Sequence, residues 1–369
     1  MGYVAVTGGR QAIEEADQLI KWYRLKDMQA LLNPEEINNQ MRLLVDRVMG
    51  EGGLYSPEYA ALALKQAEGD PAEAAFLLRA YRSTLPRRHY SVTVEPSNMR
   101  VIRRISSSFK DIPGGQLLGP TYDYTHRLLN FNMRHEEQAV EEFLRDYQLQ
   151  LKEESNSNTD VHLRKVVDLL REENLVPNKQ VDEEEPFDVT REKLIFPSSR
   201  SGRLQILSRG ETGVMTALAY SSMRGYGAIH PTIGELRVGY TDVLIPYPFG
   251  DEDDEIYIGE MMLTEVESIN GFEKNEQGNP EFTLGYGLTT GQNEVKAIAM
   301  AILESSLETE GSSPTQDEEF VLLHVDSVES NGFVSHLKLP HYITFQSKLD
   351  RIRQAKKENR NEVRPKQTQ

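Results

Sequence analysis

The sequence contains no cysteine among its 369 residues. Disulfide bonds, cysteine-ligated zinc, cysteine-ligated iron–sulfur clusters and cysteine nucleophiles are therefore excluded for this chain. A metal ion bound here has to use histidine, carboxylate, water or groups from another chain. Apolar residues make up 38% of the sequence, with 16 tyrosines and 12 phenylalanines, which is enough to form a core. The length favours two or three sub-domains.

Long apolar runs are also missing. No stretch approaches the roughly 18 uninterrupted apolar residues of a membrane span, so we expect no transmembrane helix. The first residues, Met1 to Val6, show no basic segment followed by a long apolar stretch, so we expect no secretory signal. These two absences predict a cytoplasmic chain that does not act at a membrane.

Positive charge is scarce, since 41 Lys and Arg face 58 Asp and Glu and the net charge is −17. Nucleic-acid-binding proteins normally carry a basic face, so this balance argues against that class. The charge is unevenly spread, because residues 135–190 hold 16 acidic and six basic side chains, whereas the region 79–127 is basic by comparison. We interpret 133–190 as a charged, solvent-facing helical insertion.

Helix and strand signals alternate along the chain. At 33–36 and again at 70–73, an Asn or Asp is followed by proline and, three residues on, by glutamate, which is typical of a capped helix start. Strands are predicted at 90–94, 99–105, 235–240, 241–246, 256–267 and 320–325, and later helices at about 293–307 and 342–360. Because no βαβ rhythm appears, we predict an α+β fold in which helices flank a central mixed β-sheet.

Composition predicts four parts of the chain. They are an N-terminal helical region at 1–86, an α+β core formed by 87–132 and 191–346, the charged insertion at 133–190, and a C-terminal helix with a basic tail at 347–369.

Two histidines, His336 and His341, stand five residues apart with Pro340 directly before the second. On a regular helix or strand this spacing separates the two side chains. A bend at the proline brings them together, and the pair is then able to hold one metal ion in an open site. The alternative is two unrelated histidines near a helix start, and two ligands alone make a weak motif.

A glycine pair, Gly114 and Gly115, follows Lys110 and precedes Gln116. Paired glycines let a backbone approach an anion closely, and Arg103 with Arg104 adds positive charge nearby. The spacing of a P-loop is absent. An ordinary proline–glycine turn explains the same residues equally well.

An aromatic and basic run occupies 122–127. Tyr122 and Tyr124 are able to stack on a nucleobase, and Arg127 is able to bind phosphate. Taken in isolation, this run is more typical of a strand with half-buried tyrosines.

Three carboxylates are candidates for proton transfer or charge stabilisation. Glu318 and Glu319 belong to an acidic cluster, and Glu265 follows an apolar run, where burial of a carboxylate requires a partner or a function. Solvated positions are the more common explanation for all three.

Several of these segments together resemble one family. The similarity covers 3–9, 45–53, 61–67, 76–82, 110–129, 217–220, 224–231 and 316–341, including the Gly-Gly-Gln loop and the Tyr-Asp-Tyr-Thr-His-Arg run. In that order and at that length they resemble PhnI, a family of the bacterial carbon–phosphorus lyase machinery. The resemblance leaves out about 133–190 and the C-terminal tail, where the chain departs from the family pattern.

The resemblance implies a subunit of α-D-ribose 1-methylphosphonate 5-triphosphate synthase. Such a subunit takes part in displacing adenine from ATP by methylphosphonate, with purine nucleosidase-type chemistry, and uses Mg-ATP or GTP and an alkylphosphonate as substrates. The partners implied are PhnG, PhnH and PhnJ, with the ATPase-type subunits PhnK and PhnL, in a complex containing two copies of the chain. The iron–sulfur chemistry would belong to PhnJ, consistent with the lack of cysteine here.

The resemblance also implies roles for named residues. His336 and His341 match the paired histidines that the family links to a zinc site near PhnJ. We predict a nucleotide- and phosphate-binding set: Arg103, Arg104, Lys110, Gly114, Gly115, Gln116, Tyr122, Tyr124 and Arg127. We further predict that a carboxylate among Glu265, Glu318 and Glu319 stabilises charge at the sugar. The alternative is a non-catalytic scaffold that donates metal ligands to a site shared with PhnJ.

Overall fold

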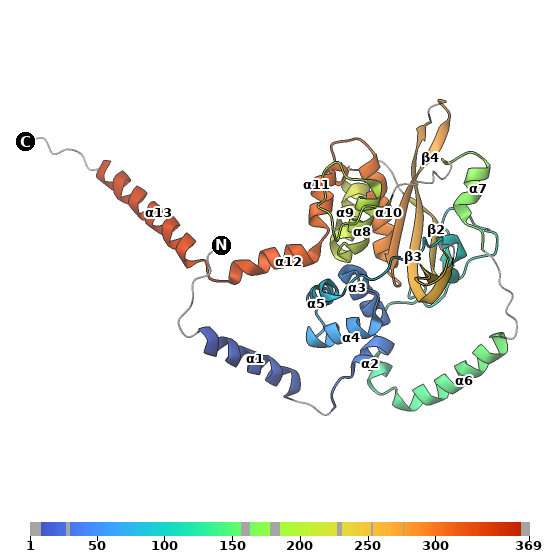
Figure 1. The fold of residues 1–369 in the computed structure, drawn as a ribbon, viewed down its shortest axis with the longest axis horizontal. Helices are drawn as coiled ribbons and strands as arrows, with labels where there is room; N and C mark the ends of the chain where they lie inside the picture. The colour runs from blue at the N-terminus through green and yellow to red at the C-terminus, as the bar shows by residue number, and fades with distance from the viewer. Residues whose placement is uncertain are drawn as a thin grey trace, which may run out of the picture. The chain divides into compact units, whose positions relative to one another are not determined.

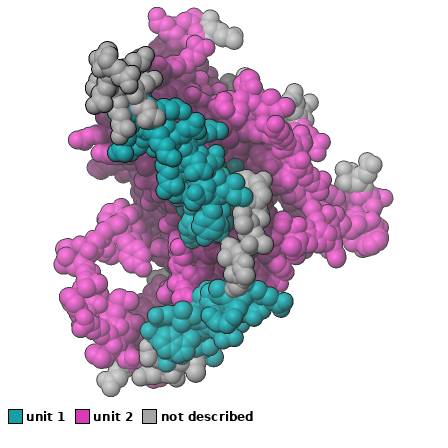
Figure 2. Space-filling model, turned by 90° about the vertical axis from the view of Figure 1, so that its left-hand side faces the viewer, with its two compact units in different colours: residues 1–33, 327–369 teal, residues 34–326 magenta. Residues whose placement is uncertain are grey.

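The computed structural model describes residues 9–26, 30–155, 163–177, 185–226, 231–251, 254–275 and 277–362. The chain divides into two compact units, shown in teal and magenta in Figure 2. The smaller unit is formed by residues 1–33 together with 327–369, and the larger unit by residues 34–326. The four-part division expected from composition stays a prediction.

A four-stranded sheet organises the described part of the larger unit (Figure 1). Its strands lie in the order β1 (Arg100–Ile105), β2 (Thr232–Pro246), β3 (Glu255–Lys274) and β4 (Pro280–Thr290). Every neighbouring pair is antiparallel. The α+β class is therefore confirmed, whereas the mixed sheet is corrected to an antiparallel one, because β2, β3 and β4 follow one another as hairpins and need no crossover.

The two faces of this sheet carry different side chains. Leu236, Val238 and Val266 face α10 (Glu294–Glu308) and form an apolar core with it. On the other face, α7 (Val166–Glu172) packs through an apolar cluster that contains Val167. Figure 1 shows α10 and α7 on opposite sides of the strands. The face under α10 is therefore apolar, whereas the face under α7 combines its apolar cluster with buried ion pairs such as Arg104–Glu235 and Lys165–Glu265.

Short helices of the larger unit precede the sheet in the chain. They are α2 (Pro34–Gln40), α3 (Arg42–Gly52), α4 (Pro57–Gln66) and α5 (Pro71–Thr84). The predicted start at Asp70 is confirmed, since its carboxylate accepts hydrogen bonds from the amides of Ala72 and Glu73 at 2.9 and 3.0 Å. Val48, Ala60 and Leu78 belong to the shared core of this bundle.

Further helices surround α10. They are α8 (Arg200–Arg209), α9 (Thr212–Ser221) and α11 (Glu318–His324), with the short turns η3 (Ser222–Tyr226) and η4 (Pro314–Gln316). The strand predicted at 320–325 is wrong, because this segment lies mostly in α11. Asp317 caps that helix by accepting from the Phe320 amide at 2.9 Å, and Val321 and Val325, four residues apart, are buried on one side. A short apolar run alone does not distinguish a strand from a short helix, and here the capping residue before the run decides for the helix.

The charged insertion has two different halves. α6 (Glu137–Ser155) is exposed wherever its side chains are described, as predicted for a solvent-facing helix. α7 and the residues before it are instead part of the larger unit, since Lys165, Val166 and Val167 are buried. No strand forms at 90–94, where a single amide, that of Val92, bonds to the Leu244 carbonyl at 2.8 Å.

Helices make up the described part of the smaller unit: α1 (Gly9–Leu25), α12 (Ser327–Ser335), η5 (His336–Lys338) and α13 (Tyr342–Glu362). Two other 3-10 turns, η1 (Pro96–Asn98) and η2 (Phe131–Arg134), belong to the larger unit. Among the residues that the structure describes, no helix combines the length and apolar character needed to cross a bilayer.

Candidate functional site

The two adjacent arginines of β1 are both buried but have different partners. Arg104 is fully buried and forms an ion pair with Glu235. Its guanidinium also donates to the carbonyl oxygens of Pro113 at 2.5 Å and Arg164 at 2.6 Å. Most of the hydrogen-bonding capacity of Arg104 is therefore used within the chain.

The glycine loop is folded around Arg104. Gly114 and Gly115 both adopt positive φ, +81° and +75°, which only glycine adopts readily. The Gln116 side chain bonds to both backbone groups of Ser106, at 2.7 and 2.9 Å. These contacts explain the glycines as a turn, and the phosphate role of this loop stays a prediction, as it does for the exposed Lys110.

Arg103 ties the next loop to the start of α10. It forms ion pairs with Asp123 and, at 2.9 Å from its Nε, with Glu294, and it donates to the Leu118 carbonyl. Because Asp123 also pairs with Arg127 at 3.3 Å, the loop at 118–127 is held against the N-terminal end of α10.

A cleft of about 260 Å³ opens where this loop meets α10. Tyr122 and Arg127 line it, so the structure brings two of the predicted nucleotide-binding residues into one cavity, whereas Tyr124 is outside its lining. The lining residues are Leu43, Arg47, Pro120, Thr121, Tyr122, Asp123, Arg127, Thr212, Gln292, Asn293, Glu294, Val295 and Lys296.

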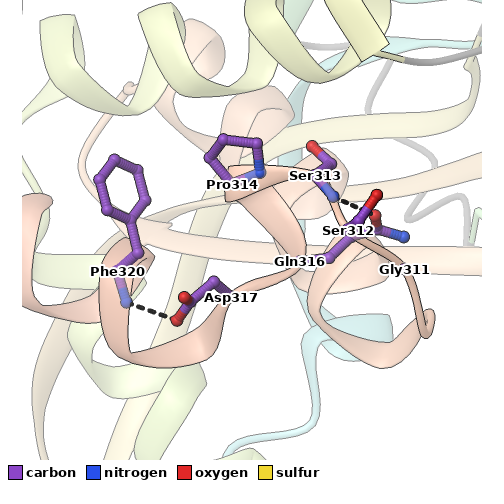
Figure 3. Close-up of a pocket in the computed structure, with 7 residues that line it drawn as sticks. All are labelled: Gly311, Ser312, Ser313, Pro314, Gln316, Asp317 and Phe320. Carbon is purple, nitrogen blue, oxygen red and sulfur yellow. Dashed lines mark hydrogen bonds between the residues drawn. The ribbon is translucent and has the colours of Figure 1, made fainter.

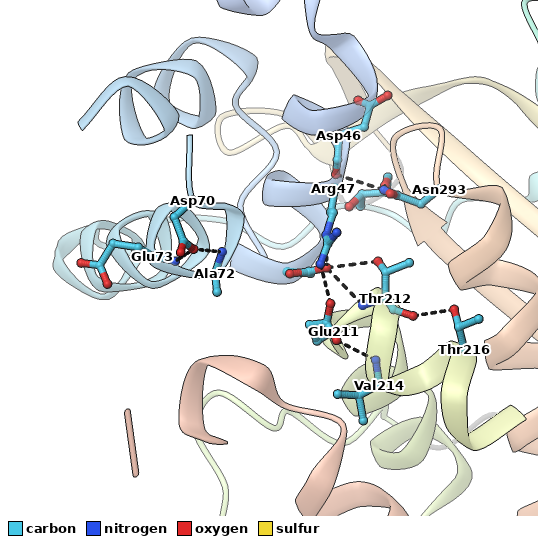
Figure 4. Close-up of polar contacts among 12 residues, drawn as sticks. Asp46, Arg47, Asp70, Ala72, Glu73, Glu211, Thr212, Val214, Thr216 and Asn293 are labelled. Atoms are coloured by element: carbon cyan, nitrogen blue, oxygen red, sulfur yellow. Dashed lines mark hydrogen bonds and ion pairs between the residues drawn. The ribbon is translucent and has the colours of Figure 1, made fainter. Parts of the chain in front are cut away.

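A network of polar contacts supports one wall of the cleft (Figure 4). Arg47, on α3, forms ion pairs with Glu211 and, at 2.9 Å, with Glu51. The same carboxylate oxygen of Glu51 accepts from the amide and hydroxyl of Thr212 at 3.2 and 3.1 Å. Asn293 joins α10 to α3 by donating to the Asp46 carbonyl at 3.0 Å. Three helices therefore converge on the cleft.

Lys296 is the residue of this cleft that sequence reasoning missed. It is 1% exposed, and its Nζ has no hydrogen-bond partner. Burial lowers its pKa to about 8, against an opposing effect of nearby Glu51. The available signal was one lysine directly before the apolar run 297–303 in the middle of this helix.

Glu265 lies on the opposite face of the sheet from α10. It is 3% exposed, accepts from Lys165 Nζ at 2.6 Å and from the Tyr286 hydroxyl at 3.2 Å. Burial pulls the pKa of Lys165 down, but Glu267 and Glu265 outweigh it and the pKa is raised. Burial also raises the pKa of Glu267. These contacts describe a buried ion-pair layer under α7, and the catalytic role of Glu265 stays a prediction.

Glu318 and Glu319 begin α11, away from the cleft lining. Glu318 accepts from the amide and hydroxyl of Ser198, with the amide at 2.9 Å, while Glu319 is exposed. A surface hollow of about 600 Å³ lies next to them (Figure 3). It is lined by Gly311, Ser312, Ser313, Pro314, Gln316, Asp317 and Phe320. Its Asp317 and Gln316 side chains accept from the amides of Phe320 and Ser313, so they serve local turns.

The two histidines of the smaller unit do come together. The ring centroids of His336 and His341 are 5.3 Å apart, and both residues are partly exposed. Each Nδ1 bonds to a backbone carbonyl, that of Phe333 for His336 and that of Leu339, at 2.6 Å, for His341. A carbonyl requires Nδ1 to be the protonated nitrogen, so both Nε2 lone pairs are left for a metal.

The pair has the separation expected of two ligands on one ion. With zinc–nitrogen bonds of about 2.0–2.1 Å in tetrahedral geometry, two imidazole centroids lie roughly 5 Å apart. Among the residues that the structure describes, no group of three or more metal-ligating side chains is present. The two histidines are therefore compatible with an open zinc site, whose remaining ligands would have to come from water, substrate or another chain.

The family described as "Bacterial phosphonate metabolism protein (PhnI)" matches residues 2–359. The chain belongs to the PhnI family. The resemblance drawn from the motifs is therefore confirmed, and it extends through 133–190, where the motifs alone showed no match.

Curated relatives of the PhnI family match nearly the whole chain. "Putative C-P lyase subunit protein HtxH" of Stutzerimonas stutzeri is 50% identical over 96% of this chain and 95% of its own. "Alpha-D-ribose 1-methylphosphonate 5-triphosphate synthase subunit PhnI" of Escherichia coli K12 is 46% identical over 96% and 99%. The protein of the same name from Rhizobium meliloti is 43% identical over 97% and 95%.

Proposed function

We propose that this chain is a subunit of α-D-ribose 1-methylphosphonate 5-triphosphate synthase that binds a purine nucleoside triphosphate and takes part in displacing its base by an alkylphosphonate. Two PhnI relatives that are named as subunits of this synthase, and that align over nearly their full lengths, support the enzyme class. PhnG, PhnH and PhnJ are the proposed core partners, with PhnK and PhnL, two copies of the chain per complex, and a cytoplasmic location.

The cleft beside α10 is the observation that carries the proposal. It combines an exposed aromatic ring, Tyr122, with the guanidinium groups of Arg47 and Arg127. An aromatic face binds a nucleobase by stacking, and guanidinium groups bind phosphate oxygens. One cavity therefore offers contacts for both ends of a nucleotide.

Carboxylates supply the other chemical requirement. Loss of a base builds positive charge on the ribose, which a fixed negative group stabilises. Asp123 and Glu294 are the carboxylates in the cleft lining, each held by Arg103. Glu265, Glu318 and Glu319 remain candidates for the carboxylate that stabilises this charge. If Glu318 has this role, Glu318→Gln slows base release, whereas an unchanged rate removes Glu318 from the candidates.

Base release from ATP or GTP tests the proposal, measured with the purified chain alone and then with PhnG, PhnH and PhnJ. Tyr122→Ala is expected to raise the nucleotide concentration for half-maximal release about tenfold, because stacking contributes about 1–3 kcal/mol. Tyr257→Ala, which removes an exposed tyrosine of β3, is the matched control. Failure to release base in every subunit combination contradicts the catalytic proposal.

A second function is favoured by the histidine pair. His336 and His341 present free Nε2 atoms but lack a third ligand in the described chain, which fits a scaffold that donates ligands to a site shared with PhnJ. Bound there, zinc would supply Lewis-acid polarisation and a template for substrate. Both residues hold their imidazoles in the ligating tautomer through backbone carbonyls.

A further inference from the structure

Two buried lysines of the larger unit are in contrasting environments. Lys165 is 4% exposed and has Glu265 at 2.6 Å and Glu267 at 3.7 Å. Lys296 is 1% exposed, yet its Nζ has no hydrogen-bond partner. A buried ammonium normally requires a partner of opposite charge, because losing its hydration is costly. The buried ammonium of Lys296 therefore has no hydrogen-bonded anion to compensate its charge.

The carboxylates near Lys296 are engaged by other groups. Glu211 pairs with Arg47 and caps α9 through the Val214 amide at 2.6 Å. Glu51 accepts from Arg47 through one oxygen, and its second oxygen is buried without a hydrogen-bond partner. Since that oxygen makes no hydrogen bond to Lys296 either, the ammonium is not neutralised by direct contact.

The start of α10 adds partial positive charge to the same cleft, and the carboxylate of Glu294 in this turn is paired with Arg103 at 2.9 Å. Residues 294–296 form its first turn, whose amides have no partner within the helix, and all three line the cleft. The Asn293 side chain does not cap them, and its Nδ2 donates instead to the carbonyls of Asp46 and Thr290 at 3.0 and 2.7 Å. The helix dipole places partial positive charge where Lys296 already stands.

We propose that the cleft binds a phosphorus oxyanion, with the first-turn amides of α10 as its direct ligands and the charge of the buried Lys296 ammonium stabilising it. The inference rests on the function proposed above and assigns its anion site. The oxyanion belongs either to a nucleotide phosphate or to the phosphonate. Arg47 and Arg127 line the same cavity, and tetrahedral oxyanions accept from several such donors at once.

Depth in the cleft sets the orientation of the ligand. Tyr122 is 63% exposed, whereas Lys296 is 1% exposed. The oxyanion therefore enters first and lies deepest, while an aromatic base remains near the surface. Burial lowers the pKa of Lys296 to about 8 in the free chain, and a dianion bound nearby would raise it again by stabilising the charged form.

Calorimetric titration of the full-length chain tests the site with ATP, methylphosphonate and adenosine as probes. Lys296→Met is expected to weaken binding of ATP or methylphosphonate at least tenfold and to leave adenosine unchanged. Lys274→Met, which removes an exposed lysine of β3, is the matched control. If the variant loses affinity for ATP alone, the site holds a nucleotide phosphate. If it loses affinity for methylphosphonate, the site holds the phosphonate. Equal affinity of Lys296→Met and the unmodified chain for both anions overturns the inference.

Hydrogen exchange on the unmodified chain provides a reading that does not depend on a variant. ATP or methylphosphonate is expected to slow exchange of the amides at 294–296, and unchanged exchange at saturation overturns the inference. Base release is measured in parallel. Lys296-dependent anion binding without base release refutes the proposed function alone, whereas base release with unaltered anion affinity refutes only this site.

Discussion

At the residue scale, the same side-chain type serves different purposes on the two faces of one sheet. Lys165 is enclosed by Glu265 and Glu267, so its charge is matched inside the chain. Lys296, on the α10 side, is equally buried and unmatched. Burial alone therefore does not distinguish a structural lysine from a binding lysine, but the presence or absence of a partner does.

Removing one member of the buried pair is expected to destabilise the fold. Glu265→Ala leaves Lys165 with Glu267 at 3.7 Å as its remaining carboxylate, and we expect a loss of about 3–5 kcal/mol in the free energy of unfolding. Urea denaturation followed by circular dichroism measures this change. Glu273→Ala, at an exposed position of β3, is the control. A stable Glu265→Ala variant that fails to release base would instead support a catalytic role.

Lys296→Met is expected to stabilise the free chain at neutral pH. Lowering the pKa of Lys296 from 10.5 to about 8 corresponds to about 3 kcal/mol that favours unfolding while the lysine is charged. Because the folded-state pKa lies below the unfolded one, that cost is complete below pH 8 and falls as pH rises from about 8 to 10.5. The advantage of the variant in urea denaturation should therefore shrink between pH 7 and pH 10. Lower stability of the variant at pH 7 would contradict this account.

At the scale of elements, the contact between β4 and α10 depends on glycine. A Cβ on Gly285 would lie 2.0 Å from the Ala301 carbonyl oxygen, and one on Gly287 would lie 2.1 Å from that of Ala297. Glycine is uncommon in strands, and β4 was accordingly absent from the strands predicted from sequence. The glycines are explained by the helix that packs on them, a contact that local sequence does not reveal.

Gly287→Ala is expected to displace α10 and cost at least about 1–3 kcal/mol of unfolding free energy, since the clash involves backbone. Thermal denaturation and titration with ATP measure the two consequences, loss of stability and loss of the anion site at the start of α10. Gly332→Ala, in α12, is the matched control because nothing lies within 4 Å of its added Cβ. Equal melting temperatures for the two variants would show that the contact is not tight.

At the scale of the whole molecule, the chain carries its two candidate sites in separate units. The cleft belongs to the larger unit, and the histidine pair belongs to the smaller one. In the described part of the smaller unit Ser327 is the only buried residue, so its helices gain little from a core of their own. The histidine pair offers two ligands, so a metal ion bound there would need further ligands from water, substrate or another subunit.

Zinc binding should reflect this incompleteness. We expect weak binding by the chain alone, tighter binding with PhnJ, and loss of both in His336→Ala or His341→Ala. His324→Ala is the control, because its Nδ1 also bonds a carbonyl, that of Phe320 at 2.6 Å, but it belongs to α11. Competition with a chromogenic chelator measures the affinities. Equal losses in His324→Ala, or retained binding in both site variants, would refute the assignment.

The sequence by itself determined the family, the α+β class and the helix starts at Pro34 and Pro71, because each depends on neighbouring residues or on a long collinear match. Tertiary structure alone decided that Arg104 faces the glycine loop, that Glu265 meets Lys165 from 100 residues away, and that α7 is buried. It also decided which of several lysines lacks a partner. Charge compensation depends on contacts between distant segments, and local spacing does not encode those contacts.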